Sequence, residues 1–187
     1  MDIDLLDKHL VRGTSSDYVL LQGNLNYEAT HQILLNSKKL NMTTIVNPSP
    51  IQFEYDSLWQ LIDIIVLNEH EFCRLTRERD VLKGMQALYQ PNVKHIIVTR
   101  SKESVLHYSG DVLEKFEVPK TEVVDTSGAG DLFCGILVGA FLKGITISES
   151  IAAAISCASL STTKIGTLES YPPSEVVESI LDSPYIK

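Results

Sequence analysis

The sequence lacks any hydrophobic run that approaches the ~20 apolar residues of a transmembrane helix. Its first ten residues carry three aspartates and no apolar run, so we expect no secretory signal. Positive charge is also scarce, because 16 Lys and Arg residues face 24 Asp and Glu residues and give a formal net charge of −8. An acidic surface repels nucleic-acid backbones and anionic lipids. We therefore expect a cytoplasmic protein that binds neither nucleic acid nor membrane.

Cysteine is scarce too, and the three cysteines are far apart in the sequence with no metal-ligand spacing. They are interpreted as small core residues in a reducing compartment. The five histidines show no such spacing either, and they are interpreted as surface or structural residues: His9, His31, His70, His95 and His107. A length of 187 residues, 44% of them hydrophobic, fits one domain with a proper core.

Short β-rich runs alternate with helical patterns along the chain. The predicted strands are 17–21, 43–46, 63–67 and 93–99, followed by a hairpin of 104–108 with 112–118. The predicted helices are 27–40, 58–61, 79–89, 129–142, 148–163 (with Ser148 as its cap) and 174–181. This alternation favours an α/β fold with a parallel sheet, in which ligands bind beyond the carboxyl ends of the strands. Polar residues fall at those ends, namely Asn24, Asn47, Asn68, Glu71 and Thr99.

The segment Asp125 to Gly135 (D-T-S-G-A-G-D-L-F-C-G) carries the chemistry, because it follows a β-rich run and opens a helix. Its small residues let backbone N–H groups approach an anion closely, and a helix start adds further free N–H groups. A carboxylate at Asp131 repels bound phosphate, yet it suits a base that takes a proton from a hydroxyl during phosphoryl transfer. The competing interpretation is that Asp131 only favours the helix dipole.

The motif D-T-S-G-A-G-D resembles the carboxy-terminal signature of the ribokinase-like (PfkB) carbohydrate kinases. Asn68 to Glu71 (N-E-H-E) is similar to the family's N-E-x-E motif, and Thr99 leads what resembles its nucleotide loop. The segments Asn47-Pro48-Ser49-Pro50 and Gly166 to Pro172 also resemble family segments in order and spacing. The resemblance covers the chain from about residue 5 to residue 181, as one partial kinase domain over 1–187.

The resemblance implies a three-layer α/β/α fold and ATP-dependent phosphorylation of a hydroxymethyl group on a sugar or sugar-like alcohol. Asp131 matches the catalytic base, and Gly128, Ala129 and Gly130 match the anion hole. Nucleotide contacts are implied at Asn68, Thr99, Ser101, Lys102, Ser104, Gly130 and Ile155. Lys102 also reads as a solvated loop charge.

The resemblance further implies two metal ions. Asn68 and Glu71 match residues that order Mg²⁺ through water, which suits an ion that keeps much of its hydration. A site for K⁺ or another monovalent cation is implied near Asp125, Ser127, Ser161, Lys164, Gly166 and Ser170. Carboxylate, hydroxyl and carbonyl oxygens are hard ligands suited to such a cation, which would order the anion hole from behind.

The sequence departs from the family in three places. The front portion, which supplies the first strands, the β-lid and most sugar contacts, has no counterpart here, so the fold is expected to be truncated on its amino-terminal side. Ser101 and Ser104 stand where glycines are usual, which predicts a differently shaped nucleotide loop. Asn24 stands where ribokinases place a sugar-binding glutamate; it remains a candidate substrate-binding residue together with Asp131.

Two classes of function therefore stay open at this point. One is a carbohydrate kinase, with a sugar or a nucleoside as acceptor. The other is a truncated, non-catalytic remnant that binds nucleotide or a partner chain. Because the missing portion would leave an apolar face and a strand edge uncovered, a homo-oligomer or a complementing chain is expected.

Overall fold

The computed structural model describes residues 12–89 and 93–183, and the chain divides into two compact units. Unit 1 contains residues up to 100 together with 106–115, and unit 2 contains residues 101–105 together with those from 116 onward. The predicted single domain over 1–187 and the histidine call at His9 extend beyond the described residues. Among the described residues, no helix is long and apolar enough to cross a membrane.

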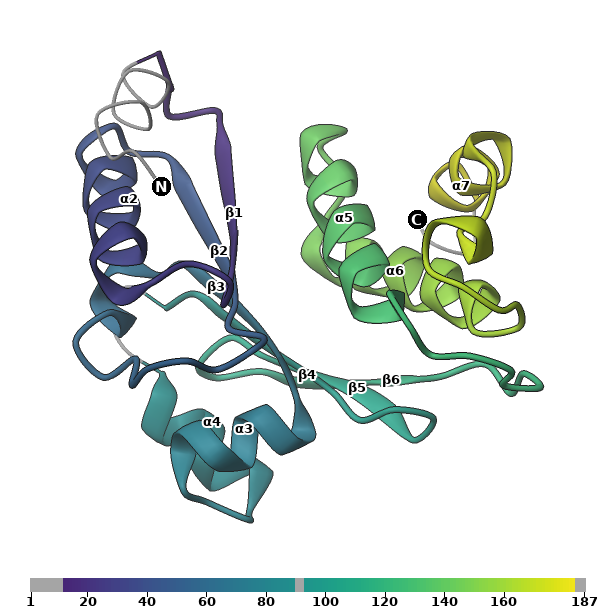
Figure 1. The fold of residues 1–187 in the computed structure, drawn as a ribbon, viewed down its shortest axis with the longest axis horizontal. Helices are drawn as coiled ribbons and strands as arrows, with labels where there is room; N and C mark the ends of the chain where they lie inside the picture. The colour runs from purple at the N-terminus through teal and green to yellow at the C-terminus, as the bar shows by residue number, and fades with distance from the viewer. Residues whose placement is uncertain (1–11, 90–92, 184–187) are drawn as a thin grey trace. The chain divides into compact units, whose positions relative to one another are not determined.

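The sheet has six strands, and their order in the sheet is their order in the chain (Figure 1). They are β1 (Tyr18–Gln22), β2 (Thr43–Asn47), β3 (Ile64–Asn68), β4 (His95–Thr99), β5 (Ser104–Tyr108) and β6 (Leu113–Glu117). The pairs β1–β2, β2–β3 and β3–β4 are parallel, with Leu67 opposite Val98. The prediction of a parallel sheet and a closing hairpin is confirmed. Residues 45–46 of β2, 64–67 of β3 and 96–98 of β4 are apolar and buried, as expected for parallel strands that are covered on both faces.

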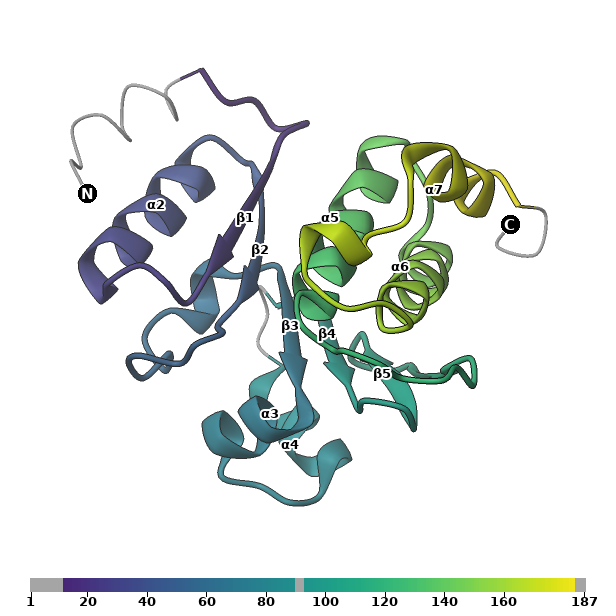
Figure 2. The same ribbon diagram turned by 45° about the vertical axis from the view of Figure 1, so that its right-hand side comes forward.

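The helices of unit 1 are α2 (Tyr27–Lys39), α3 (Glu69–Thr76) and α4 (Val81–Leu88), with a short 3₁₀ helix η1 at Trp59–Leu61. In both ribbon views α2 lies beside β1 and β2, and α3 lies beside α4 (Figures 1 and 2). Side chains from the helices and the sheet form one core in unit 1, which includes the fully buried Leu34, Phe72 and Met85. The sequence pattern did not predict helix α3 at 69–76.

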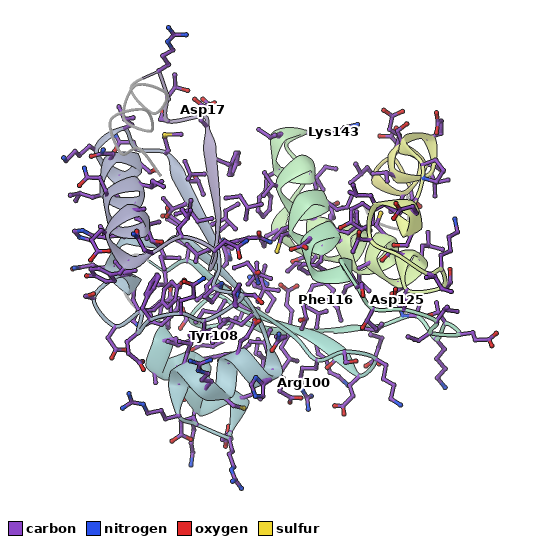
Figure 3. The ribbon with its side chains drawn as sticks, viewed as in Figure 1. Asp17, Arg100, Tyr108, Phe116, Asp125 and Lys143 are labelled. Atoms are coloured by element: carbon purple, nitrogen blue, oxygen red, sulfur yellow. The ribbon has the colours of Figure 1, made fainter. Side chains whose placement is uncertain are left out.

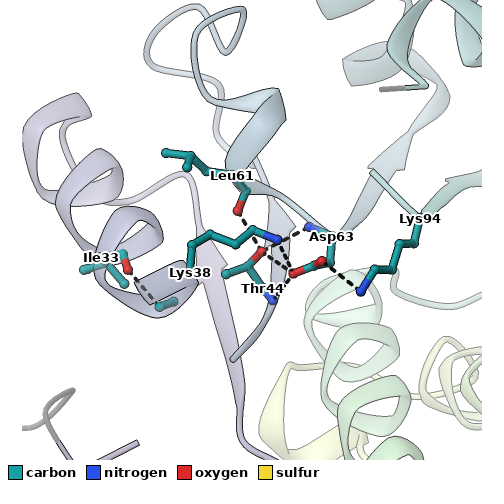
Figure 4. Close-up of polar contacts among 7 residues, drawn as sticks. Ile33, Lys38, Thr44, Leu61, Asp63 and Lys94 are labelled. Carbon is teal, nitrogen blue, oxygen red and sulfur yellow. Dashed lines mark hydrogen bonds and ion pairs between the residues drawn. The ribbon is translucent and has the colours of Figure 1, made fainter. Parts of the chain in front are cut away.

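A buried carboxylate joins four segments of unit 1 (Figure 4). The carboxylate of Asp63, just before β3, is ion-paired with Lys38 at 2.8 Å and with Lys94 at 3.3 Å. It also accepts hydrogen bonds from the backbone N–H and the hydroxyl of Thr44, each at 2.9 Å. Burial alone raises the pKa of Asp63, but the hydrogen bond and charge of Lys38 and the hydrogen bonds of Thr44 outweigh it and hold the pKa below its usual value.

A second polar chain in unit 1 crosses β4, β5 and β6. Nδ1 of His95 lies 2.9 Å from Nε2 of His107, whose Nδ1 lies 2.8 Å from a carboxylate oxygen of Glu114. His107 is buried and His95 is partly buried. Burial, followed by the charges of His107 and Lys94, lowers the pKa of His95 to about 4. These two histidines therefore have the structural role that the sequence predicted.

Unit 2 is mainly helical, with α5 (Ala129–Leu142), α6 (Ile147–Ser161), the 3₁₀ helix η2 (Leu168–Ser170) and α7 (Ser174–Leu181). The views in Figures 1 and 2 both place α5 against α6, and α6 also packs on α7. The predicted bounds of α5 and α7 are confirmed. The prediction of Ser148 as the cap of α6 is wrong. The cap is Thr146, because it forms a reciprocal capping box with Glu149 and the helix starts earlier.

Candidate active site

The candidate site lies at the start of α5 in unit 2. Gly128 precedes this helix in a left-handed conformation (φ +75°), which a residue with a side chain adopts only with strain. Gly130 and Asp131 stand in the first turn of α5, where backbone N–H groups point away from the helix toward its amino-terminal end. The Asp131 side chain is exposed in the same turn. The arrangement places the positive end of a helix dipole and an accessible carboxylate together.

Asp125 fixes the loop that leads into α5 (Figure 3). Its Oδ1 accepts the N–H of Ser127 at 2.9 Å and its Oδ2 accepts the N–H of Gly166 at 3.0 Å. The hydrogen bonds from Gly166 and then from Ser127 lower the pKa of Asp125 to about 2, so the carboxylate stays ionised. The N–H groups of Val124 and Asp125 both donate to the carbonyl of Thr162. The loop before α5 is thus tied to the loop after α6.

Tyr171 makes a further contact with this helix start. Its hydroxyl donates a hydrogen bond to the carbonyl oxygen of Gly128 at 3.0 Å. Burial, and then the negative charge of Asp131, raises the pKa of Tyr171, so the phenol keeps its proton. Sequence reasoning assigned Tyr171 no role beyond membership in the late loop. A single aromatic residue between Ser170 and Pro172 is a weak signal by itself.

The residues predicted to hold a monovalent cation all belong to unit 2. The structure brings Gly166 to Asp125, whereas the buried hydroxyls of Ser161 and Ser170 donate to the carbonyls of Ala158 and Thr167. Lys164 is exposed. The ionised carboxylate of Asp125 is a hard oxygen donor, which fits a monovalent cation better than a softer metal. No group of three or more His, Cys, Asp or Glu side chains among the described residues suits a metal ion.

In unit 1 the predicted Mg²⁺-ordering pair forms the amino-terminal cap of α3. Oδ1 of Asn68 accepts the N–H of Glu71 at 2.8 Å, and Oε2 of Glu71 accepts the N–H of Asn68 at 3.0 Å. Glu71 is buried and Asn68 is exposed. The N-E-H-E motif is therefore a capping box, which explains the helix that the sequence reading did not include. Any role of this pair toward magnesium stays a prediction.

The other strand-end residues of unit 1 gather as expected from a parallel sheet. Asn68 lies opposite Thr99, whose hydroxyl is 3.4 Å from the carbonyl oxygen of Leu67. The side-chain amide of Asn47 donates to the carbonyl of Val66 at 2.9 Å. Asn24 is exposed after β1 and donates to the side chain of Gln22. These contacts fix the carboxyl edge of β1 to β4.

The residues that are predicted to contact the nucleotide differ in burial and backbone conformation. Ser101 takes the left-handed conformation (φ +53°) that a glycine would adopt freely, so the backbone bends there despite the serine. Ser104 is fully buried, and its hydroxyl has no partner among the described residues. Lys102 is exposed, as a solvated loop charge would be, and Ile155 is buried within α6.

Comparison with known proteins gives a consistent result. The family model described as pfkB family carbohydrate kinase matches residues 8–174. A ribokinase of Lactococcus lactis is 30% identical over 166 residues, which cover 89% of this chain and 54% of that protein. A probable fructokinase of Arabidopsis thaliana is 27% identical over 140 residues, covering 70% and 41%. The chain thus spans about half the length of these relatives.

Solved structures agree on the fold. The crystal structure of a ribokinase from Thermotoga maritima matches with a TM-score of 0.82 and 28% identity, covering 98% of this chain and 60% of that one. The Arabidopsis thaliana ribokinase complexed with ribose and ATP matches with a TM-score of 0.84 and 25% identity over the same shares. The predicted ribokinase-like α/β fold is confirmed.

Proposed function

The chain belongs to the pfkB family of carbohydrate kinases, and we propose that it carries the phosphate-handling part of an ATP-dependent kinase acting on a hydroxymethyl group of a sugar or sugar-like alcohol. The proposal rests chiefly on one observation, the exposed carboxylate of Asp131 in the first turn of α5, at the positive end of the helix dipole. A carboxylate there opposes simple phosphate binding but suits proton transfer.

In the proposed reaction Asp131 accepts the proton of the acceptor hydroxyl as its oxygen bonds to the γ-phosphorus. The bond from that phosphorus to the β–γ bridging oxygen breaks, and ADP leaves. The backbone N–H groups of Gly128, Ala129 and Gly130 stabilise charge on the transferring group. Because α5 begins at Ala129, its dipole adds to this stabilisation.

The remaining residues are proposed in supporting roles. Asn68 and Glu71 would order Mg²⁺ through water, and the ion would neutralise charge on the nucleotide phosphates. Thr99, Ser101, Lys102, Ser104 and Ile155 are proposed nucleotide contacts. A potassium ion near the carboxylate of Asp125 and the carbonyls around Gly166 would stabilise the loop that precedes α5.

The sugar class is proposed from the relatives. Their names are ribokinase, probable fructokinase and deoxyribokinase, and one similar structure is a complex with ribose and ATP. Asn24 is proposed to contact the acceptor, since an amide can hydrogen-bond to hydroxyl groups. A homo-oligomer or a complementing chain stays a proposal for the partner of this chain.

The test measures ADP release from Mg-ATP in potassium buffer across a panel of sugars and nucleosides. We expect release that depends on one sugar class and that falls about 10²- to 10⁴-fold in Asp131→Asn. ATP binding, measured by calorimetry, should persist in that variant. Asp111→Asn, at an exposed carboxylate in the turn between β5 and β6, is the matched control. Absence of release with every acceptor, or full activity in Asp131→Asn, would contradict the proposal.

A further inference from the structure

The carbonyl oxygen of Gly128 receives two hydrogen bonds. One comes from the backbone N–H of Leu132 at 2.9 Å and is the first hydrogen bond of α5. The other comes from the hydroxyl of Tyr171 at 3.0 Å. Tyr171 follows η2 and lies 43 residues away in the chain, so this second bond is a tertiary contact made within unit 2.

The orientation of this carbonyl matters because a peptide group is planar. The carbonyl of Gly128 and the N–H of Ala129 belong to one peptide group and point in opposite directions. That N–H donates a hydrogen bond of 3.2 Å to the carbonyl of Thr126, which is longer than the two hydrogen bonds on the carbonyl side. The two hydrogen bonds to the carbonyl oxygen therefore fix the plane of the Gly128–Ala129 peptide group. That plane determines the orientation of the next amides in the helix, those of Gly130 and Asp131.

The ring of Tyr171 also fits the absence of a side chain at Gly128. A Cβ built on Gly128 would lie 2.8 Å from the Tyr171 hydroxyl oxygen and 3.3 Å from the ring, as well as 3.3 Å from Cβ of Thr167. The glycine, in its left-handed conformation, and the tyrosine thus occupy complementary space. Any side chain at residue 128 would have to displace the hydroxyl.

We propose that Tyr171 is a positioning residue, which holds the Gly128–Ala129 peptide in the orientation that directs the amides at the start of α5 toward the transferring phosphoryl group. It acts through the backbone and does not itself contact the reacting atoms. This inference rests on the proposed kinase function and deepens it, because it adds a side chain to the machinery of the anion hole.

The first test compares Tyr171→Phe with wild type. The variant removes one oxygen and keeps the ring, so we expect kcat to fall about tenfold, less than the loss seen when a direct oxyanion donor is removed. KM for ATP and for the acceptor should stay within about twofold, because a group that acts in the transition state changes kcat. Tyr27→Phe is the control; its hydroxyl bonds to Ser57 in unit 1, and kcat should not change.

A double-variant cycle tests the pairing. Gly128→Ala should reduce kcat less in the Tyr171→Phe background than in wild type, because the nearest clashing atom is gone. Additive losses, or a fall in thermal midpoint that accounts for the whole loss of activity, would overturn the positioning role.

The amide NMR signal of Leu132 separates this inference from the proposed function. In Tyr171→Phe this signal should shift, since Leu132 shares the Gly128 acceptor, whereas Tyr27→Phe should leave it unchanged. If wild type has no kinase activity but the Leu132 signal shifts, the function fails and the contact stands. If wild type is active while the signal and kcat are unaffected by Tyr171→Phe, the inference fails and the function stands.

Discussion

Asp63 of unit 1 and Asp125 of unit 2 are both held below their usual pKa, but by different means. Asp63 is 4% exposed and is met by two lysines and a threonine. Asp125 is partly exposed, and its two oxygens accept backbone N–H groups of Ser127 in its own loop and of Gly166. The charge of Asp63 is paired with lysine side chains, whereas the charge of Asp125 is stabilised by hydrogen bonds from its loops.

The difference separates a structural carboxylate from one that is proposed to be functional. A buried charge must be paired, and its value lies in joining the segments that surround it. A charge held by dipoles in an open loop can still attract a cation, and it fixes the backbone without neutralising the site. The comparison therefore predicts that substitutions at Asp63 reduce stability, whereas substitutions at Asp125 reduce activity.

The largest expected effect is on stability at Asp63. Asp63→Ala should lower the free energy of unfolding by about 3 kcal/mol, because it leaves Lys38 and the Thr44 amide without their acceptor. Denaturant unfolding followed by circular dichroism measures this loss. Asp56→Ala, at an exposed aspartate of the same unit, is the control and should change stability by about 0.5 kcal/mol or less. Equal losses of stability in the two variants would show that Asp63 contributes no more to stability than an exposed aspartate.

At Asp125 the expected effect is on activity. Asp125→Asn should reduce kinase activity about tenfold or more, as for residues that orient a site from behind, with little change in thermal midpoint. In wild type, replacing potassium with tetramethylammonium should weaken activity or ADP binding, and the variant should no longer respond to that exchange. Activity that is indifferent to the cation in wild type would count against the cation site.

Acidification should reduce the stability of unit 1 by a smaller amount. The pKa of His95 is about 4 in the folded protein, and an unfolded histidine has a pKa near 6.5. Because the unfolded chain binds the proton first, stability should fall as the pH drops from about 6.5 toward 4. The contribution of Asp63, whose folded pKa is lowered, is lost only at lower pH. His95→Gln should flatten the fall between pH 6.5 and 4 in thermal melts; an unchanged slope would rule His95 out as its source.

The smallest expected effect is at Ser101. Ser101→Gly should raise the free energy of unfolding by about 0.5 kcal/mol, because glycine adopts the observed left-handed conformation without strain, although it loses more entropy on folding. Ser16→Gly is the matched control, since Ser16 does not have a positive φ. Chemical denaturation should show a higher free energy of unfolding for Ser101→Gly and no increase for Ser16→Gly. Equal changes in the two variants would show that the backbone at Ser101 is not strained.

The order of the elements could be predicted because apolar runs and helical stripes are local signals, and the bounds of α5 were recovered in full. Helix α3 could not be predicted, since its eight residues are mostly polar and the motif at its start is interpreted as a ligand motif. The family resemblance located Asp131 and the glycine loop. The contacts of Asp63 with Lys94 and of Tyr171 with Gly128 join residues distant in sequence, which no local pattern encodes.

The strands lie in the sheet in the order in which they occur along the chain. A ribosome releases the chain in that same order, so each new strand emerges when its neighbour is already available for pairing. The three parallel pairs among β1 to β4 form without any later segment. Assembly of this sheet can therefore proceed during synthesis, which shortens the time for which its apolar strands stay open to aggregation.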